Sequence, residues 1–549
     1  MKQRNWLPLQ LFAACLVGLL LGKFCFSSSK ERMELSLFNG KVSKLQSIMN
    51  IIDNKYVDHI DIDSLNELVI PQVLKHLDPH SIYIPAKDLN QTEKEVVGHY
   101  YGVGITTMTF SDTATIVNII PGGPAALQSE LKVGDQILSV NGEDATGPVA
   151  SNTVTDRISG DYGTSASLTI KRFGIDTLIH IDVPRGKVPV NSLTSSYMVD
   201  STTSYFKLES FSDRTYYEFL HSVNDLWKDN KIRNLILDLR DNGGGRLEPA
   251  RQLACLFTIT GDTVFVMKKR DNEIERICID TSSMRGLKLT AMRMACLVDY
   301  NTASAAEMVA AALQDNDRGI IVGRRTFGKG LVQTPTLMPD GSQVNITTER
   351  IYAPSGRTIQ KPYDEYKTDN YSKRVANGEM DSAAAFKPTD TTKYYTFRDR
   401  TVYSKSGIMP DVFVPLAEWP QNKTSKMLLS STTMIQYIVN RYVRHEGDED
   451  DFIKSICDDE QATFDDFIAY AQLHNSNITL PKRKDKKELD ECRAEICPII
   501  KAYAYYVVGD MSSCEKYFNH NDMDIAAAAN ALHNDSIYAT ILRKIRNKK

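Results

Sequence analysis

Apolar residues recur at helical spacing near both ends of the chain. Within residues 31–95, Leu45, Ile48 and Ile52 follow one another at intervals of three and four, which predicts helices separated by polar segments. Residues 424–549 are also helical in composition, with an acidic and a basic run that we expect to form loops. The sequence contains no internal repeat.

Between these ends the pattern changes to strands. Residues 100–185 contain short β-rich runs punctuated by glycine. In residues 190–362, apolar runs such as 235–239 alternate with helix-like runs such as the alanine-rich 303–313, which predicts an α/β layered domain. Residues 363–400 are polar and rich in tyrosine, and we expect them to form a long surface excursion.

The N-terminus carries an apolar stretch with a basic flank. The stretch runs from Trp6 to Phe26 and follows Lys2 and Arg4, a pattern typical of a secretory signal or signal anchor. Including both ends, it is about long enough to cross a bilayer. The small residues 27–29 could also be a cleavage site, so both alternatives stay open. Because positive charge stays on the cytoplasmic side, we expect the rest of the chain to be exported.

Composition excludes several classes of protein. Of the 549 residues, 42% are apolar and 24% charged, values ordinary for a soluble globular protein. The net charge of −4 gives no overall field that would favour nucleic acid. Nine cysteines without a CxxC pair are too few for a disulfide scaffold, and His76 and His80 lack a third ligand nearby. No metal or cofactor is therefore implied.

A glycine-containing segment predicts a peptide-binding module. In Gly102-Val103-Gly104-Ile105, two glycines let backbone N–H groups converge, as capture of a terminal carboxylate requires. This segment is followed in order by 119–126, with its Pro-Gly-Gly-Pro turn, and by 131–142, with Gly-Asp and Asn-Gly turns. The ordered set closely resembles a PDZ domain. The resemblance implies that a peptide C-terminus adds as a strand beside residues 105–107.

Three further motifs carry candidate chemistry. Residues 238–245 end in three glycines whose amides are unshielded, as an oxyanion hole requires. Ser304 lies between small residues at the start of a predicted helix, where free N–H groups favour an oxyanion. Lys329 lies between glycines, and burial of an amine lowers its pKa so that it can take a serine proton, while Gln333 could orient it. Taken singly, each motif has another interpretation. The glycine run could be a phosphate-binding turn or a plain strand-to-helix turn, Ser304 a helix cap and Lys329 a solvated turn residue.

Together, the order of these motifs and the spacing from Ser304 to Lys329 and Gln333 resemble the carboxyl-terminal processing, or tail-specific, serine protease family. Segments 77–81 and 407–411 also match that family, and the resemblance covers about residues 35–415. It implies that Ser304 is the nucleophile, Lys329 the general base and Gln333 the residue that orients the base. The implied oxyanion donors are the N–H groups of Ala305 and Gly244.

The chain departs from the family pattern at three positions near these motifs. Gly243 stands where proline is common, Thr302 where serine or glycine is usual, and Ala306 where a small residue or serine is usual. None of these changes removes a reactive group. The extra glycine leaves open which amide of the 243–245 run points inward.

The resemblance implies an α/β multi-domain fold with a protease core similar to the crotonase and caseinolytic-protease superfold. A β-rich PDZ domain is inserted into this core, and a helical region follows it. The predicted divisions are a signal anchor or signal peptide (1–30), an N-terminal helical part of the protease (31–98), the PDZ domain (99–186), the serine protease core (187–420) and a helical C-terminal domain of unassigned role (421–549).

The favoured hypothesis is an exported serine endopeptidase that cleaves near exposed or unstructured C-termini of envelope proteins. It would be anchored in the inner membrane by its N-terminal segment, with the catalytic part on the periplasmic, extracytoplasmic side. Its partners would be protein or peptide substrates with free C-termini and not nucleic acid, and a homo-oligomer is left open. The alternatives are an inactive PDZ-containing scaffold or adaptor of the cell envelope, and acyl-thioester chemistry on a similar fold. The intact Ser304, Lys329 and Gln333 set argues against the scaffold, and the PDZ-like insertion argues against the thioester chemistry.

Overall fold

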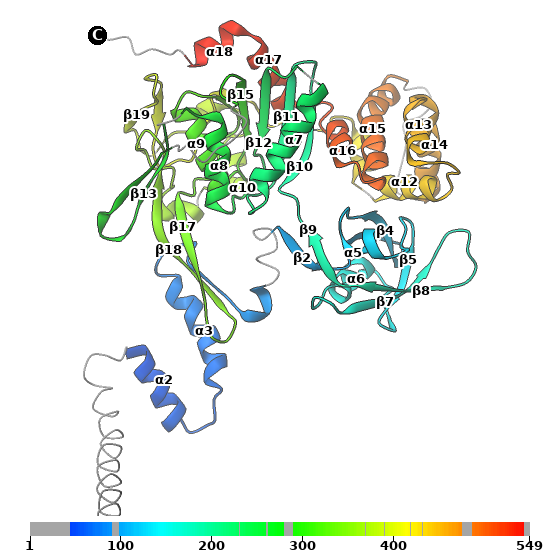
Figure 1. The fold of residues 1–549 in the computed structure, drawn as a ribbon, viewed down its shortest axis with the longest axis horizontal. Coiled ribbons are helices and arrows are strands. Elements are labelled where there is room, and N and C mark those ends of the chain that lie inside the picture. Colours follow the sequence, from blue (N-terminus) through cyan, green and yellow to red (C-terminus); the bar gives the residue numbers. More distant parts are fainter. Residues whose placement is uncertain are drawn as a thin grey trace, which may run out of the picture. The chain divides into compact units, whose positions relative to one another are not determined.

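The chain forms two compact units, Met1–Pro85 and Ala86–Lys549, in a computed structural model (Figure 1). The structure describes residues 44–89, 98–229, 231–259, 262–278, 289–367, 369–388, 390–417, 419–430, 432–474 and 486–542. The predicted signal segment at 1–30 lies outside these residues. Among the described residues, no helix combines the length and the apolar character needed to span a bilayer.

The described part of the first unit is mainly helical, as the spacing of its apolar residues predicts. It contains α2 (Lys44–Lys55), α3 (Ile62–Leu74) and the short strand β1 (Ile82–Ile84). Asp61 caps α3 by accepting hydrogen bonds from the amides of Asp63 and Ser64. Further on, Asp78 closes the turn before β1, because its carboxylate accepts from the amide and the hydroxyl of Ser81.

The β-rich segment of the second unit is a twisted antiparallel sheet with two helices. Its strands follow the order β3-β4-β5-β7-β8, with β6 beside β5, so within the described residues β3 is an edge strand. Isoleucine, valine and leucine side chains from the sheet and from the second helix form its core. The elements are β2 (His99–Gly102), β3 (Ile105–Phe110), β4 (Thr113–Ile119), α5 (Pro124–Gln128), β5 (Gln136–Val140), β6 (Glu143–Asp144), α6 (Ala150–Ile158), β7 (Ser165–Lys171), β8 (Ile179–Pro184) and β9 (Gly186–Pro189), of which β2 pairs with β9.

The central sheet of the second unit is predominantly parallel. Its order is β10-β11-β12-β15-β16-β21, and all neighbouring pairs are parallel except β10 with β11. The strands are β10 (Leu193–Met198), β11 (Thr203–Leu208), β12 (Asn234–Asp238), β15 (Arg293–Val298), β16 (Ile320–Gly323) and β21 (Val412–Phe413). One face packs on α7 (Thr215–Asp229), α8 (Leu247–Phe257) and α9 (Ala305–Asp315) through the largest apolar cluster.

The other face of this sheet is covered by the end of the chain. In α17 (Met523–His533), Ile525, Ala528 and Leu532 are buried against Ile236 and Leu297 of the sheet. The helix α18 (Asp535–Leu542) continues the same layer, drawn in red at the top of Figure 1. A sheet buried on both faces needs apolar cover on both, so the last helices complete the α/β/α core.

A second sheet and an irregular segment complete the core. The sheet contains β13 (Thr263–Lys268), β14 (Ile274–Cys278), β17 (Leu331–Leu337) and β18 (Gln343–Tyr352). A short 3₁₀ turn, Arg270–Asn272, connects β13 to β14. The irregular segment that follows β18 contains α10 (Tyr371–Ala376), β19 (Lys393–Tyr395), β20 (Thr401–Tyr403) and 3₁₀ turns at Tyr363–Lys367 and Ala383–Ala385. The expectation of a surface excursion at 363–400 is wrong in part, because Arg374, Thr396 and Arg400 are buried there.

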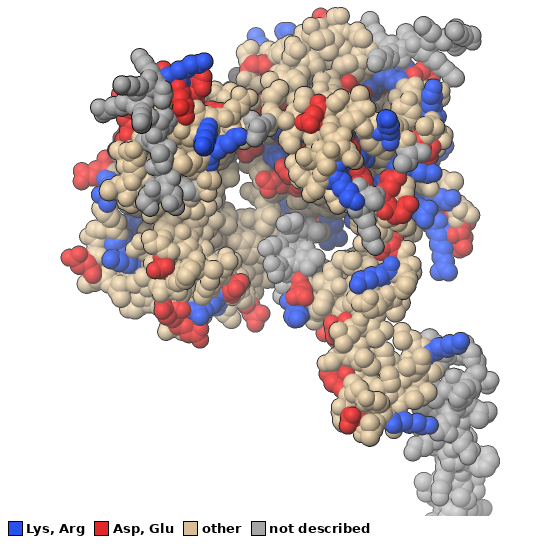
Figure 2. Space-filling view, turned by 180° about the vertical axis from the view of Figure 1, so that it is seen from behind, with Lys and Arg blue, Asp and Glu red and all other residues tan. Residues whose placement is uncertain are grey.

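A helical bundle packs on the β-rich segment. It consists of α11 (Lys423–Leu429), α12 (Thr433–Val443), α13 (Glu449–Cys457), α14 (Glu460–His474), α15 (Lys486–Val507) and α16 (Met511–Phe518). Phe110 on β3 and Val117 on β4 belong to the same apolar cluster as Tyr437 on α12 and Ile500 on α15. Figure 2 shows acidic and basic side chains interspersed over the face that it draws.

Candidate active site

Three loops that follow parallel strands meet at one edge of the central sheet. Residues 239–245 follow β12, residues 299–304 follow β15, and residues 324–330 follow β16. The carboxyl ends of adjacent parallel strands lie at the same edge, which is where α/β sheets place their sites. Backbone hydrogen bonds join the loops. The amide of Ala303 donates to the carbonyl of Asn242 (2.9 Å), and the amide of Phe327 donates to the carbonyl of Thr302 (3.0 Å).

Ser304, the predicted nucleophile, occupies the position before the first turn of α9. Its backbone has φ +57° and ψ −120°, a conformation that a residue with a Cβ rarely adopts. Its side chain is half-buried, whereas the neighbouring Ala303 and Ala305 are buried. The first amides of a helix have no acceptor within the helix, so the Ala305 N–H can serve an oxyanion.

A buried glutamate joins the nucleophile to the loop of the predicted base. One oxygen of Glu307, Oε2, accepts hydrogen bonds from the amides of Ser304 (3.0 Å) and Lys329 (2.7 Å). The other, Oε1, accepts from the amide of Gly328 (2.8 Å) and the hydroxyl of Thr326 (2.5 Å). The structure thus brings Ser304 and Lys329 together through their backbones, within two hydrogen-bond lengths of each other.

The charge of Glu307 is controlled by its surroundings. Its side chain is fully buried, and burial raises the pKa of the carboxyl although the four hydrogen bonds oppose that shift. Glu307 is not among the residues predicted from the sequence motifs. The signal was present, because serine followed three positions later by glutamate is the capping-box pattern, in which the glutamate accepts from the amide of the capping residue.

The glycine loop lies directly against the nucleophile. A Cβ built on Gly244 would stand 2.8 Å from the Cβ of Ser304 and 3.0 Å from the amide of Ala305, and its φ is +103°. The Gly244 amide donates to Oδ1 of Asn242 (2.9 Å), whose Nδ2 donates to the carbonyl of Leu208 (2.9 Å). Gly244 therefore lies beside Ser304 and Ala305, and its N–H donates to Asn242 in this structure. Which glycine serves an oxyanion remains a prediction.

Lys329 lies just before the strand β17, and Gln333 lies within it. Gln333 is half-buried on β17, and its Nε2 donates to the hydroxyl of Thr347 on β18 (3.2 Å). Lys329 is half-buried before the same strand, between Gly328 and Gly330. The amide of Gly330 donates to Oε1 of Gln360 (2.9 Å). The amides of the two glycines that flank Lys329 are therefore both hydrogen-bonded to side chains, that of Gly328 to Glu307 and that of Gly330 to Gln360.

The predicted carboxylate-binding loop connects β2 to β3. Val103 is buried, and its carbonyl accepts from the amide of Ala125 (2.7 Å) at the start of α5. Gly104 has φ +83°, and a Cβ there would approach the Cα of Gly123 to 3.2 Å, so only glycine fits without strain. Gly102 and Ile105 bound this tight loop, and Ile105 begins the edge strand β3.

Known proteins match the segments that carry these features. The family model of peptidase family S41 matches residues 202–367, and that of the PDZ domain matches residues 91–169. A carboxy-terminal-processing protease of Bartonella bacilliformis is 30% identical over 323 residues, which are 58% of this chain and 73% of the relative. The chain belongs to the carboxy-terminal processing protease family.

Two further proteins are similar to this chain. The carboxy-terminal processing protease CtpA of Bacillus subtilis is 29% identical over 370 residues, 66% of this chain and 77% of the relative. A solved structure titled photosystem II D1 C-terminal processing protease is 23% identical and covers 67% of this chain and 91% of its own, with a TM-score of 0.33.

Family membership confirms several predictions from the sequence. The protein is a serine-type peptidase with a PDZ domain, and its substrates are proteins or peptides. The predicted α/β multi-domain fold with a helical C-terminal region is confirmed as well.

Proposed function

We propose that Ser304 and Lys329 form the catalytic dyad of an exported endopeptidase that cleaves near exposed or unstructured C-termini of envelope proteins. The observation that carries the proposal is the shared carboxylate oxygen of Glu307, which accepts from the amides of both residues. Two residues far apart in the chain are thereby held at one point, at the sheet edge where α/β enzymes react.

In this proposal Ser304 Oγ attacks the carbonyl carbon of the scissile peptide while the neutral amine of Lys329 takes the hydroxyl proton. The tetrahedral oxyanion receives hydrogen bonds from the N–H of Ala305 and from an amide of the 243–245 loop. Lys329 then gives its proton to the leaving amine, and an acyl-enzyme remains. Water attacks the acyl group with Lys329 again as the base, and Ser304 regains its proton.

Gln333 orients the base in this scheme. Its Nε2 donates to the hydroxyl of Thr347 on β18, and this hydrogen bond orients the side-chain amide. The amide oxygen of Gln333 can then accept a hydrogen bond from the amine of Lys329. An amine held by one acceptor keeps its lone pair aimed in one direction, as a general base must.

The substrate tail binds to the PDZ domain. The open edge of β3 can accept a peptide as a further strand, and the tight loop 102–105 at the start of β3 can receive the terminal carboxylate. The charged and apolar N-terminal segment within residues 1–30 supports export, with membrane attachment and an extracytoplasmic catalytic part.

The test uses an unfolded protein with an apolar C-terminal tail as substrate. We expect fragments from the wild type and none from Ser304→Ala or Lys329→Ala. The matched controls Ser455→Ala and Lys454→Ala, both exposed on α13, should cleave like the wild type. Unchanged cleavage by the Ser304 variant would rule out the dyad. Tail binding without any cleavage by the wild type would favour the scaffold alternative.

A further inference from the structure

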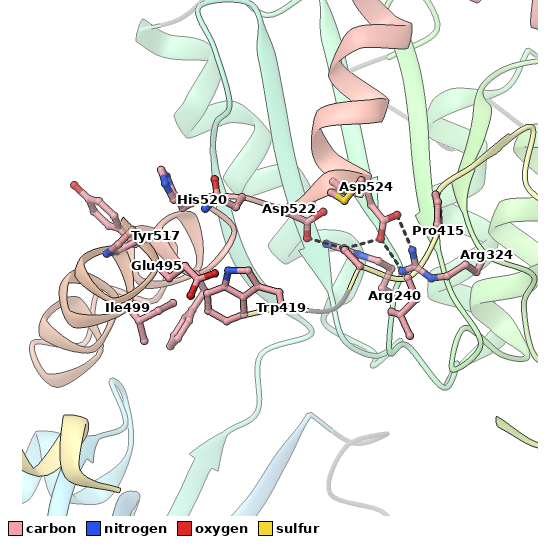
Figure 3. A pocket seen from close by; sticks show the side chains of 16 residues that line it. Arg240, Arg324, Pro415, Trp419, Glu495, Ile499, Tyr517, His520, Asp522 and Asp524 are labelled. Atoms are coloured by element: carbon pink, nitrogen blue, oxygen red, sulfur yellow. Dashed lines mark hydrogen bonds and ion pairs between the residues drawn. The ribbon is translucent and has the colours of Figure 1, made fainter. Parts of the chain in front are cut away.

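A buried cluster of charges joins the end of the chain to the catalytic loops. Asp524, near the start of α17, accepts two hydrogen bonds from Arg324 (2.8 and 2.7 Å) and one from Arg240 (2.9 Å). Asp522 accepts from the same nitrogen of Arg240 (2.7 Å). Figure 3 shows these side chains meeting at one end of a pocket between the protease core and the helices that follow it.

The two arginines stand at the bases of two different catalytic loops. Arg240 follows β12 and directly precedes the glycine loop at 241–245. Arg324 follows β16 and directly precedes the loop that carries Lys329. A single carboxylate that binds both arginines therefore fixes the distance between the bases of the two loops.

This carboxylate lies outside the segment matched by the peptidase family model, which ends at residue 367. Its position on α17 is itself well determined by the fold. Asp522 caps the helix by accepting from the amide of Ile525 (3.0 Å), and the apolar face of α17 is buried on the central sheet. Asp524 thus reaches the arginines from a rigid element.

The cluster is charged and nearly dry. The side chain of Asp524 is 5% exposed, and those of Arg240 and Arg324 are 13% and 12% exposed. Arg240 also pairs with Asp238, which is fully buried. Burial would raise the pKa of Asp238, but the charges of Arg240 and Lys207 outweigh it and lower that pKa to about 2. Removal of the Asp524 carboxylate takes one carboxylate partner from each of two largely buried arginines.

We propose that Asp524 is a positioning residue of the peptidase: it holds the oxyanion loop and the general-base loop at their working separation, so that the last helices of the chain act as a built-in activating element. The proposal rests on the dyad proposed above. Asp524 acts through Arg240 and Arg324 and does not touch the substrate. Small displacements of catalytic groups reduce the rate far more than they reduce binding.

The variants are Asp524→Asn and, as a matched control, Asp535→Asn. Asp535 lies at the start of α18 and pairs with Arg293, but its side chain is 85% exposed. Each change removes one carboxylate charge from an ion pair in the same C-terminal layer and keeps the side-chain shape. Deletion of α17 is not informative, because it would also expose the apolar face of the sheet.

The measurement is the steady-state cleavage of an internally quenched peptide with a free apolar C-terminus by the full chain. We expect Asp524→Asn to lower kcat about tenfold to a hundredfold while KM changes less than about threefold, since the PDZ domain still binds the tail. Labelling of Ser304 by a fluorophosphonate should slow by the same factor. The variant Asp524→Glu should recover part of the rate, and Asp535→Asn should match the wild type.

Each outcome decides the question. A folded Asp524→Asn enzyme with wild-type kcat overturns the positioning role and leaves the dyad intact. Peptide cleavage that survives Ser304→Ala overturns both proposals. A fall in Tm with kcat unchanged makes Asp524 structural only. If Asp524→Asn does not fold, Asp522→Asn, which removes one partner from Arg240 alone, takes its place: reduced kcat at constant KM supports the proposal, and unchanged kcat overturns it.

Discussion

The substitution Glu307→Gln tests the feature that brings the nucleophile and the base together. The carboxylate accepts four hydrogen bonds, two on each oxygen. A glutamine keeps one acceptor oxygen and places an NH₂ group where the other stood. In one orientation that group faces the amides of Ser304 and Lys329, and in the other it faces the amide of Gly328.

The magnitude follows from these contacts. Hydrogen bonds to a charged acceptor contribute about 1.5–3 kcal/mol each, so loss of two removes about 3 kcal/mol or more of the interactions that fix the site. Since about 1.4 kcal/mol corresponds to tenfold in rate, we expect kcat to fall about a hundredfold. Relief of the buried charge offsets part of the loss in stability, so the free energy of unfolding should fall by less than that sum.

The assay is cleavage of the quenched peptide, with the unfolding midpoint measured on the same preparation. The control is Glu449→Gln, which removes an exposed carboxylate from the first turn of α13. A folded Glu307→Gln enzyme with kcat within about twofold of the wild type would refute the reasoning, because the backbone positions of the dyad would then not depend on the carboxylate.

Three further predictions concern the glycine loop, the titration of Glu307 and the contact between the PDZ domain and α12. Gly244→Ala should abolish cleavage, because its Cβ would stand 2.8 Å from that of the proposed nucleophile, whereas Gly243→Ala, with no atom within 4 Å of the new Cβ, should stay active. Burial raises the pKa of Glu307 above its ordinary 4.5, so the folded protein keeps a proton that the unfolded chain loses, and stability should fall as the pH rises from about 4.5; urea unfolding across this range should show a smaller slope for Glu307→Gln. In Gly134→Ala a Cβ would lie 2.1 Å from Cγ1 of Val443 and φ is +91°, so hydrogen exchange in β4 should accelerate; with Val443→Ala in addition, only the φ strain should remain.

The loops that carry the proposed catalytic residues could be predicted from the sequence because the elements that flank them are regular. The apolar run 235–239 corresponds to β12 (Asn234–Asp238), and the alanine-rich run 303–313 corresponds to α9 (Ala305–Asp315). Once these are a strand and a helix of a parallel sheet, the residues after the strand and before the helix must share one edge. Local pattern and topology together therefore place Ser304.

The packing partners of the last helices were not within reach. Amphipathic spacing in residues 424–549 indicates that each helix buries one face, but not what covers it. The structure divides these helices: α12 and α15 share an apolar cluster with the PDZ strands β3 and β4, whereas α17 and α18 cover the central sheet. Long-range contacts of this kind depend on the whole fold, and no local periodicity encodes them.

Polar composition misled the prediction for residues 363–400 for a related reason. Charged residues are rarely buried unless paired, so a charged, tyrosine-rich segment favours the surface. Here Arg374 is buried and pairs with Asp369. Burial would raise the pKa of Asp369, but the hydrogen bonds and charges of Arg374 and Arg325 outweigh it and lower that pKa to about 2. Arg374 lies only five residues from Asp369, but Arg325 lies 44 residues from it, and the sequence shows these charges without their pairing.

Two consecutive arginines at the start of the loop that carries Lys329 pair with carboxylates from later in the chain. Arg324 pairs with Asp524 of α17, whereas Arg325 pairs with Asp369 (2.8 Å) and Glu379 (2.6 Å) of the polar segment. The base of the loop is therefore bound by carboxylates from two different segments, Asp524 of α17 and the pair Asp369 and Glu379, and all three follow the peptidase family segment. In the functions proposed above, Ser304 and Lys329 supply the reactive groups, and two later segments supply charges that position the loop of Lys329. Loss of either set of carboxylates should therefore disturb the same loop.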